Sequence, residues 1–349
     1  DTHIEDWDES FLSQIDPVNY VKMLRMAKVD STVLYAHSHV GCCNYPTKVG
    51  HMHKGLKGRD VFGEIAALCR RYNIRVVAYY SLIFNNWAYD NNPDWRIVRA
   101  DGTYAASDRD DRKKTSRYGV CCPNSPYRDY IVKEIAEICT GYDIDGIRFD
   151  MTFWPMVCYC RHCAARYASE VGGPLPTKID WTDSKWVKFQ RCRERWLIEF
   201  AAIATNTARR LKPNISVEHQ SSTYPLAWQW GVTAGLTEQC DFLQGDFYGG
   251  QLQASFACKL LYNLTKNQPF GYETSATYNL GNTYKPKELL HAQAFNAIAN
   301  SGAFIFIDSI DPIGTINPAV YKAMGEIFSQ TKAYDQYLGG RLCQDVGVY

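Results

Sequence analysis

Short apolar runs alternate with helical patterns along most of the chain. The runs are rich in β-branched and aromatic residues and are bounded by turn residues, which is typical of strands. We predict eight strands, at residues 2–7, 31–39, 74–82, 145–151, 214–222, 240–249, 268–276 and 303–311.

Amphipathic patterns with helix-start signals lie between these runs. At Asp16-Pro17 an N-cap side chain precedes a first-turn proline, so a helix is expected to start there. Strand–helix alternation favours a parallel α/β fold, and eight such units predict a (β/α)8 TIM barrel. The predicted helices cover residues 16–28, 58–73, 126–142, 184–212 and 285–302.

Three segments depart from this repeating unit. Residues 83–118 form a long polar insertion after the third strand, where we expect a lid or rim loop. A cysteine-rich loop follows the fourth strand. A new strand-like run begins near the end of the chain. We therefore expect residues 1–335 to form a catalytic barrel and residues 336–349 to be the start of a truncated second domain or a linker.

Composition and charge narrow the choice of partners. The 349 residues carry a formal net charge of +1 without a long block of like charge, which gives no support for a nucleic-acid or membrane-surface partner. No apolar run is long enough for a transmembrane helix. Aromatic residues make up 14% of the chain, an abundance typical of sugar-binding clefts and also of large cores.

The 13 cysteines are odd in number and lack the framework of a small secreted domain. We expect a reducing, cytoplasmic setting with most thiols buried. Three of them, in the loop after the fourth strand, have the spacing C-x-C-x-x-C, which is a plausible metal-ligand spacing. A structural zinc takes four ligands, and we expect Cys122 to be the fourth, with Cys121 or His162 as substitutes. The alternative is a set of reduced thiols without metal. The three loop cysteines are Cys158, Cys160 and Cys163.

In a barrel of this kind the active site lies at the carboxyl ends of the strands. Several carboxylates, histidines and aromatic residues stand at these predicted ends, and no Ser-His-Asp order, dinucleotide-binding loop or Walker sequence accompanies them. The residues at the ends are His37, His39, Tyr79, Tyr80, Ser81, Asp150, Glu218, His219, Gln220, Asp246, Tyr248, Glu273, Asp308 and Asp311.

A barrel mouth rich in carboxylates is suited to glycoside hydrolysis, which needs no catalytic cofactor. A retaining enzyme places its nucleophile and its acid/base about 5–5.5 Å apart, whereas an inverting enzyme places the two carboxyl groups about 6.5–9.5 Å apart. Any one strand-end carboxylate can instead cap a helix or bind backbone amides. The pattern therefore predicts a catalytic pair without fixing its members.

Several stretches of the chain resemble α-L-fucosidases of glycoside hydrolase family 29. HSHVG at residues 37–41 resembles the H-H-D-G-F stretch of those enzymes. VVAYYSL resembles their strand 3, and DIDGIRFDM resembles their strand 4, whose final Asp is the nucleophile. Through YPTKVGHMH, VCCPNSPYRDY, SVEHQ, GDFYGG and FIDSIDPIGTINP, the whole chain resembles the related α-L-fucosidases of family 151, first described as hypothetical glycosyl hydrolases. The resemblance implies a barrel enzyme that acts on a fucoside or related oligosaccharide.

Carried over residue by residue, this resemblance makes Asp150 the nucleophile of a double displacement. It makes His39 the second histidine of a sugar-binding pair. Ser38 stands at the first histidine of that pair and Val40 at the Asp that follows it, so hydrogen bonding to the sugar differs from family 29. His37 is a candidate for the vacant role.

The acid/base does not carry over, and physical grounds rank Glu218 first, then Glu273 and then Asp246. Glu218 is expected on the strand next to that of Asp150. Arg148 is expected to point to the same side as Asp150 and to hold its carboxylate ionised, with a structural ion pair as the alternative. The other candidates for sugar binding, for which packing is the alternative, are Tyr80, Trp87, Trp154, His219, Asp246 and Tyr248.

Three other interpretations stay open. The first is a β-galactosidase-like enzyme with a strand-4 acid/base and Glu273 as nucleophile. The cysteine loop resembles the zinc loop of family 42 β-galactosidases, which carry a trimer-forming domain, so a homo-oligomer is a further expectation. The second is a catalytically weak or non-catalytic barrel that binds carbohydrate or acts as a scaffold, which the altered His-Ser-His stretch keeps open. The third, an amidohydrolase-like metal barrel, would use His37, His39 and His219, but the H-x-H is not at the strand-1 position that such sites use and no matching Lys follows on strand 4.

Overall fold

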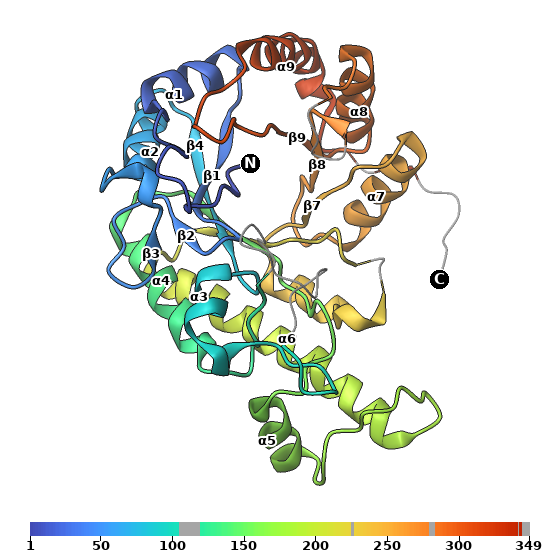
Figure 1. Cartoon of the computed structure of the whole chain (residues 1–349). Helices are drawn as coiled ribbons and strands as arrows, with labels where there is room; N and C mark the ends of the chain where they lie inside the picture. Colours follow the sequence, from blue (N-terminus) through green and yellow to red (C-terminus); the bar gives the residue numbers. More distant parts are fainter. Residues whose placement is uncertain (105–118, 225–226, 279–282, 341, 344–349) are drawn as a thin grey trace.

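A computed structural model describes residues 1–104, 119–224, 227–278, 283–340 and 342–343. Seven parallel strands follow one another in chain order around the interior, and the helices lie outside them (Figure 1). Seven of the eight predicted strands are therefore confirmed. They are β1 (Ser31–His37), β4 (Arg75–Ser81), β5 (Gly146–Asp150), β6 (Ser216–His219), β7 (Gln244–Asp246), β8 (Gly271–Ser275) and β9 (Ala303–Ile307).

The strands fall into two hydrogen-bonded sheets. β1, β4, β5 and β6 form one, extended by the short strands β2 (Cys42–Cys43) and β3 (His51–Met52), whereas β7, β8 and β9 form the other. Two backbone hydrogen bonds join β6 to β7, from the Ser221 N–H to the Gln244 carbonyl and from the Asp241 N–H to the Val217 carbonyl, both 2.8 Å. The arrangement is a mixed α/β fold in which consecutive strands are neighbours.

The predicted first strand, residues 2–7, is wrong, because these residues form no strand. The segment lies between the ends of β9 and β1 (Figure 1), and a side chain rather than a backbone ladder ties it to the β1 end. The His39 N–H donates to Nδ1 of His3 at 3.1 Å. A backbone hydrogen bond from Ile310 to Asp1, at 3.4 Å, holds its start beside the end of β9. One side-chain contact and one backbone hydrogen bond thus position this segment where a strand ladder was expected.

The five predicted helices are confirmed with shifted ends. The Asp16 side chain accepts a hydrogen bond from the Val18 N–H at 2.9 Å, which is the expected N-cap. Two helices of the ring, α7 and α9, were not predicted. The helices are α1 (Pro17–Met26), α2 (Val61–Arg71), α3 (Asn86–Asn91), α4 (Tyr127–Gly141), α5 (Arg161–Glu170), α6 (Ser184–Leu211), α7 (Gln251–Leu264), α8 (Lys287–Ala299) and α9 (Pro318–Thr331).

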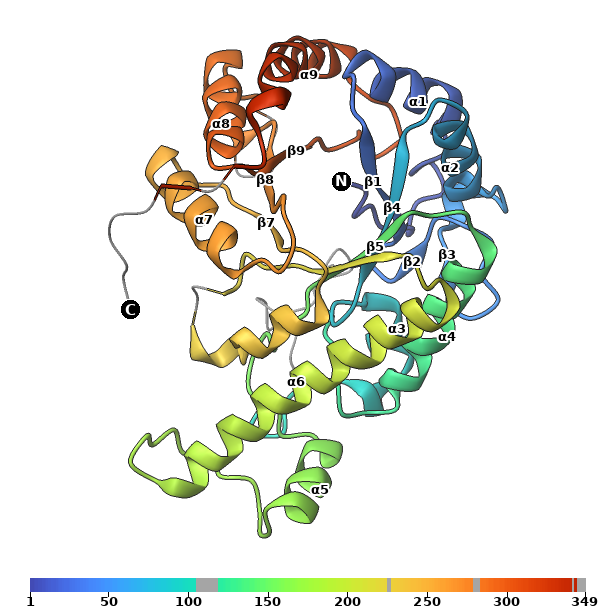
Figure 2. The same ribbon diagram turned by 180° about the vertical axis from the view of Figure 1, so that it is seen from behind.

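Two layers of side chains follow from the alternation along each strand. Outward-facing side chains such as Leu34, Ala78 and Ile147 are buried in the main apolar core under the helices. Near the carboxyl ends of the same strands, inward-facing positions such as Tyr79, Arg148 and Asp150 carry polar side chains, and the candidate site lies there. Figure 2 shows the 28-residue α6 crossing the outside of the sheet, with α5 projecting from the ring. Among the described residues, none of the helices combines the length and hydrophobicity that crossing a membrane requires.

Two segment predictions fall partly outside the described residues. Residues 83–104 of the expected lid contain α3 and a 3-10 turn at Pro93–Trp95, so this part is not a simple loop. Residues 105–118 lie outside the described residues, as do residues 341 and 344–349 of the expected second-domain start. Twelve of the 13 cysteines are buried, which confirms the expected burial of most thiols.

Candidate active site

The register of the strands brings polar side chains into one inner layer. Tyr35, Tyr79, Arg148 and Glu218 are successive pairing partners across β1, β4, β5 and β6. Side chains of directly paired residues lie on the same face of a sheet. These four therefore share the inner face. Arg148 also forms an ion pair with Glu273 of β8, across the ring.

Asp150 is the last residue of β5 and lies two positions after Arg148, so the two side chains are on the same face of the strand. Its carboxylate accepts hydrogen bonds from the Tyr79 hydroxyl and from the Met151 N–H, the latter at 2.7 Å. Burial raises its pKa to about 6, although Arg148 and the Tyr79 hydrogen bond act in the opposite direction. Asp150 is therefore a buried carboxylate that is largely ionised at neutral pH.

Arg148 lies between two glutamates. Its Nε is 3.6 Å from Oε2 of Glu218, and its Nη1 donates to Oε2 of Glu273. Burial raises the pKa of Glu218 well above its usual range despite Arg148, and burial also raises the pKa of Glu273. Oε1 of Glu218 has no hydrogen-bond partner among the described residues. Glu218 is therefore the carboxyl of this pair best placed to hold a proton.

Asp246, at the end of β7, is a different kind of carboxylate. It accepts hydrogen bonds from Gln220 at 2.7 Å, from Ser222 at 2.9 Å and from the Tyr248 hydroxyl at 2.6 Å. Burial would raise its pKa, but Arg148 and these three donors lower it below the usual value. Asp246 is therefore held as an anion, which makes it the weakest of the three candidates for a proton donor.

His39 reaches the carboxylate cluster from the end of β1. Its Nδ1 lies 2.7 Å from the Ser81 hydroxyl, and its Nε2 lies 3.3 Å from the Tyr79 hydroxyl and 3.8 Å from Oδ2 of Asp150. The ring of His3 stacks on it with centroids 3.6 Å apart. The predicted site residues thus brought together are Asp150, Arg148, Glu218, Glu273, Asp246, Tyr248 and His39.

His37 and Tyr80 are not brought to this cluster. A register shift in the β1–β4 ladder pairs Tyr35 with Tyr79 but His37 with Tyr80, so one extra residue turns the His37 ring to the outer face. There it stacks on Tyr80 with centroids 4.7 Å apart, beside Glu134 of α4. Both residues lie in the layer between strands and helices.

His219 and Trp154 also lie away from the carboxylates. His219 directly follows Glu218 in β6, so its ring points to the opposite face of the strand, towards α6. There its two ring nitrogens each lie 2.9 Å from a hydroxyl, one of Thr152 and the other of Thr205. The Trp154 indole N–H donates to the Arg193 carbonyl at 2.9 Å, and its ring is fully buried. These contacts are the ones expected of core side chains.

A buried carboxyl lies behind the site. Glu134 of α4 has no exposed surface and accepts hydrogen bonds from the Tyr80 and Tyr130 hydroxyls. Burial raises its pKa from the usual 4.5 to about 7, against the effect of these donors. Because its proton is held more tightly in the folded state, its contribution to stability is fully present below about pH 4.5 and is lost as pH rises through about 7.

Glu134→Gln is therefore expected to change how stability depends on pH. The variant cannot ionise, so its unfolding free energy relative to the native protein should rise by roughly 3 kcal/mol between pH 4.5 and pH 8, following 1.36 kcal/mol per pKa unit. Urea unfolding at both pH values measures this change. Glu170→Gln is the control, because hydrogen bonds from arginines lower the pKa of Glu170 in spite of its partial burial, so its pH dependence lies mainly below pH 4.5 and little change is expected between pH 4.5 and pH 8. If the difference in unfolding free energy between Glu134→Gln and the native protein does not change with pH, the raised pKa of Glu134 is contradicted.

Four buried thiols form a separate cluster at the loop after β5. Their Sγ atoms all lie within 4.8 Å of one another, and Sγ of Cys122 is 3.5 Å from those of Cys160 and Cys163. A tetrahedral zinc with Zn–S bonds of about 2.3 Å would set its sulfurs about 3.8 Å apart. The cluster therefore has the composition and the spacing of a metal site. Its members are Cys122, Cys158, Cys160 and Cys163.

The surroundings of the cluster favour Cys122 over its two substitutes. The Asn124 backbone N–H donates to Sγ of Cys122 at 3.4 Å, and the Asn124 side chain donates to Sγ of Cys163 at 3.3 Å. Donors of this kind stabilise thiolate ligands. His162 instead contacts Asp94 at 2.9 Å. The thiol of Cys121 lies 4.0 Å from a backbone carbonyl oxygen outside the cluster.

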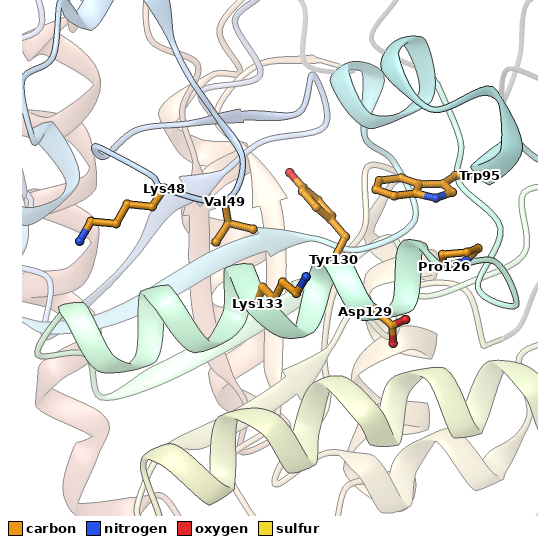
Figure 3. A pocket seen from close by; sticks show the side chains of 7 residues that line it. All are labelled: Lys48, Val49, Trp95, Pro126, Asp129, Tyr130 and Lys133. Carbon is orange, nitrogen blue, oxygen red and sulfur yellow. The ribbon is translucent and has the colours of Figure 1, made fainter.

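A hollow of about 490 Å³ lies elsewhere, on the outer side of α4. Figure 3 shows Tyr130 and Lys133 of α4 beside Val49 and Trp95. The hollow shares Tyr130 with the Glu134 network but contains none of the predicted site residues. It is therefore not the candidate active site. Its lining consists of Lys48, Val49, Trp95, Pro126, Asp129, Tyr130 and Lys133.

Sequence reasoning missed some polar residues of the inner layer and left Tyr79, a strand-end residue, without a role. Tyr79 stands two positions before Ser81, the partner of Asp150, so it shares the inner face and could have been assigned to the site. The same alternation along β7 places Gln244, two positions before Asp246, on the inner face. Its side-chain Nε2 lies 3.4 Å from Oε2 of Glu273. His3 had no such signal, because its segment is not a strand.

Comparisons with known proteins agree with this architecture. Residues 16–151 match the family described as "Hypothetical glycosyl hydrolase 6". No curated protein matches the chain. The α-L-fucosidase isoenzyme 2 from Paenibacillus thiaminolyticus is similar in structure, with 20% identity, a TM-score of 0.80, and coverage of 97% of this chain and 49% of that one.

Two further solved structures have the same arrangement. The β-galactosidase from Bacillus circulans sp. alkalophilus has 16% identity, a TM-score of 0.69 and coverage of 96% of this chain and 55% of that one. The α-L-fucosidase from Vibrio sp. strain EJY3 has 15% identity, a TM-score of 0.54 and coverage of 94% and 46%. The chain spans about half the length of these proteins. It therefore has a glycoside-hydrolase-like fold related to α-L-fucosidases and β-galactosidases, and its residues 16–151 match a hypothetical glycosyl hydrolase family, as the fucosidase resemblance implied.

Proposed function

We propose that the chain is a retaining exo-glycoside hydrolase that acts on α-L-fucosides. The observation that carries the proposal is the position of Asp150. Its buried carboxylate lies at the end of an inner strand and is hydrogen-bonded to Tyr79. Arg148, two residues earlier, faces the same side and pairs with two glutamates of raised pKa. Two carboxyl groups with different protonation are what double displacement needs.

In this mechanism Asp150 attacks the anomeric carbon of the sugar, and the leaving oxygen takes a proton from Glu218. The same glutamate then removes a proton from water, which hydrolyses the glycosyl-enzyme. A pKa of about 6 leaves Asp150 ionised at neutral pH, whereas the burial of Glu218 favours its protonated form. Glu218 ranks before Glu273 because the guanidinium of Arg148 is hydrogen-bonded to Glu273 and stabilises its anion.

Sugar hydroxyls would be bound by polar side chains around Asp150. His39 and Tyr79 both lie within 4 Å of its carboxylate group. The Tyr248 hydroxyl donates a hydrogen bond to Asp246 at the end of β7. His39 carries over from the fucosidase resemblance, whereas Tyr79 and His3 are added by the geometry. We also propose that residues 1–7 complete the seven strands into a variant (β/α)8 barrel. Residues 1–335 would form the catalytic domain of a cytoplasmic homo-oligomer.

A β-galactosidase-like activity is the second candidate. It is favoured by the hydrogen bond from Arg148 to Glu273, which supports an ionised carboxylate on β8, and by the TM-score of 0.69 with a β-galactosidase. In that case Glu273 would be the nucleophile and Asp150 or Glu218 the acid/base. The two candidates place the covalent intermediate on different strands.

Turnover of aryl glycosides tests the proposed function. The chain is expected to hydrolyse an aryl α-L-fucoside with retention of configuration, followed by NMR of the first-formed sugar anomer. A 2-fluoro-fucosyl fluoride should label Asp150, and peptide mapping identifies the residue. Labelling of Glu273 by a 2-fluoro-galactosyl reagent, with turnover of an aryl β-galactoside alone, would favour the second candidate. Carbohydrate binding without turnover on either substrate would reject both.

We further propose that the four-cysteine cluster holds a structural zinc ion. Four thiolates leave no open coordination position, so the ion would brace the loop after β5 rather than take part in hydrolysis. Purified protein that has not met a chelator is expected to contain about one zinc per chain at this cluster. Cys160→Ser should lower the zinc content and the melting temperature. Elemental analysis with less than about 0.2 zinc per chain would count against the site.

A further inference from the structure

A second group of metal-binding side chains lies outside the carboxylate site and the cysteine loop. Cys42 of β2 and His51 of β3 are direct partners in the parallel pairing of these two short strands, so their side chains lie on one face. Asp6 reaches them from the N-terminal segment. One ligand atom from each of these three residues lies within 4.8 Å of the other two.

The backbone around the group is held in place by polar contacts. Nδ1 of His53 accepts a hydrogen bond from the Gly55 N–H, which leaves Nε2 as the N–H that donates to the Glu5 carbonyl at 3.0 Å. This bond fixes the chain immediately before Asp6 against β3. The ring of His51 stacks parallel to the indole of Trp87, with centroids 5.8 Å apart. Asp6 and His51 are thus oriented before any ligand binds.

We propose that Asp6, Cys42 and His51 form a binding site for a divalent transition-metal ion of the zinc type. A carboxylate, a thiolate and an imidazole are ligands that Zn²⁺ and Co²⁺ accept together, whereas Mg²⁺ and Ca²⁺ require oxygen ligands. The set is sheltered from solvent: Cys42 is 3% exposed, and the side chains of Asp6 and His51 are 18% and 26% exposed. This partial burial distinguishes it from an exposed acidic cluster.

Binding requires a small local change. Nε2 of His51 is now 2.6 Å from Oδ2 of Asp6, which is a hydrogen bond. Two ligands bound at about 2.05 Å with a tetrahedral angle would be about 3.3 Å apart. The metal therefore replaces this hydrogen bond by two coordination bonds, the imidazole proton moves to Nδ1, and the thiol of Cys42 loses its proton to solvent.

Three protein ligands leave a fourth position open, and a cavity lies there. A cavity of about 160 Å³ is lined by all three ligand residues. Its wall also contains Trp7 and the oxygen-bearing side chains of Asn86 and Asp90. Water or an oxygen atom of a small ligand can therefore complete the tetrahedron. The site is thus of the open type, unlike the closed four-thiolate cluster.

Metal stoichiometry of the full chain tests this proposal. Metal-free protein, prepared with a chelator under reducing conditions, is titrated with Co²⁺ or Zn²⁺ alone and followed by calorimetry and by thiolate-to-cobalt absorption. The native chain is expected to bind one equivalent more than Cys42→Ser and than His51→Gln. Because the comparison is between variants, the result does not depend on whether the four-cysteine cluster also binds an ion.

Matched controls separate this site from adventitious binding. Cys343→Ser removes an exposed thiol, and Cys139→Ser removes a buried thiol outside both clusters, so each should keep the native stoichiometry. His51 lies partly exposed at the surface, so His51→Gln should stay folded even if Cys42→Ser does not, and circular dichroism verifies this. Equal stoichiometry in the native chain and in folded His51→Gln would overturn the proposal, as would equal losses in the two cysteine controls.

Discussion

Asp150→Asn is expected to lower kcat/KM for an aryl α-L-fucoside by at least about 1000-fold, because removal of a nucleophile leaves only binding and charge stabilisation. The amide keeps the volume of the carboxyl group and can still accept from the Met151 N–H, so the fold should be retained. Initial rates at several substrate concentrations measure the loss.

The pH dependence of the native chain provides an independent check of this role. The nucleophile must be ionised, and burial raises the pKa of Asp150 to about 6. As pH falls through this value the carboxylate takes up a proton, so kcat/KM should decrease about tenfold for each unit below it. If protonation instead leaves the rate unchanged down to pH 4.5, Asp150 is not the group that attacks.

Asp145→Asn is the matched control on the opposite end of the same strand. Asp145 accepts a hydrogen bond from the Val76 N–H at 2.8 Å and pairs with Arg70, so its role is structural. The variant is expected to lose stability but to keep kcat/KM within about threefold. Azide should restore turnover to Asp150→Gly with formation of a glycosyl azide. Native-like turnover in Asp150→Asn, or no azide product from folded Asp150→Gly, would contradict the nucleophile assignment.

The strands were predictable because burial and alternation are local properties of sequence. Most of the seven observed strands carry apolar outward positions, such as Leu34, Ala78 and Ile147, that are buried in the core, and this period-two signal is readable without coordinates. The segment at 2–7 carries only two strongly apolar residues, Ile4 and Trp7, three positions apart, so it lacks this period-two signal. Its position depends instead on a hydrogen bond from His39 to the ring of His3, which is 36 residues away in sequence.

The candidate site was predictable as far as side chains alternate regularly between the two faces of each strand. Positions two apart on one strand, such as Arg148 and Asp150, share a face, and the expected inner location of both is what the geometry shows. The same alternation predicted an inward-facing His37. The register shift between Tyr35 and His37 turns it outward instead, and no residue pattern in the sequence signals this shift. Glu134 lies on a helix, where strand parity carries no information about its contact with Tyr80.

The effect of Arg148 on stability is the second large expectation. Arg148→Met leaves Glu218 and Glu273 buried without their cation, which is expected to cost about 3–5 kcal/mol of unfolding free energy at neutral pH. The deficit should depend on pH. Without the guanidinium both carboxyl groups hold their protons to a higher pH in the folded state, so stability is retained at acidic pH and lost as pH rises. Urea unfolding at pH 5 and pH 8 measures both values.

Arg193→Met is the control for removal of a buried arginine. Arg193 donates to the main-chain carbonyl of Gln229 and to the Gln190 side chain, and no carboxylate of the described residues forms an ion pair with it. Its loss should cost similar stability at pH 5 and pH 8. The double variant Arg148→Met/Glu273→Gln should recover part of the deficit at pH 8, because the amide does not ionise. If Arg148→Met loses the same free energy at both pH values, the guanidinium does not control the charge of these carboxyl groups. The ranking of Glu218 before Glu273 as acid/base, which rests on the contact between Arg148 and Glu273, would then lose its basis.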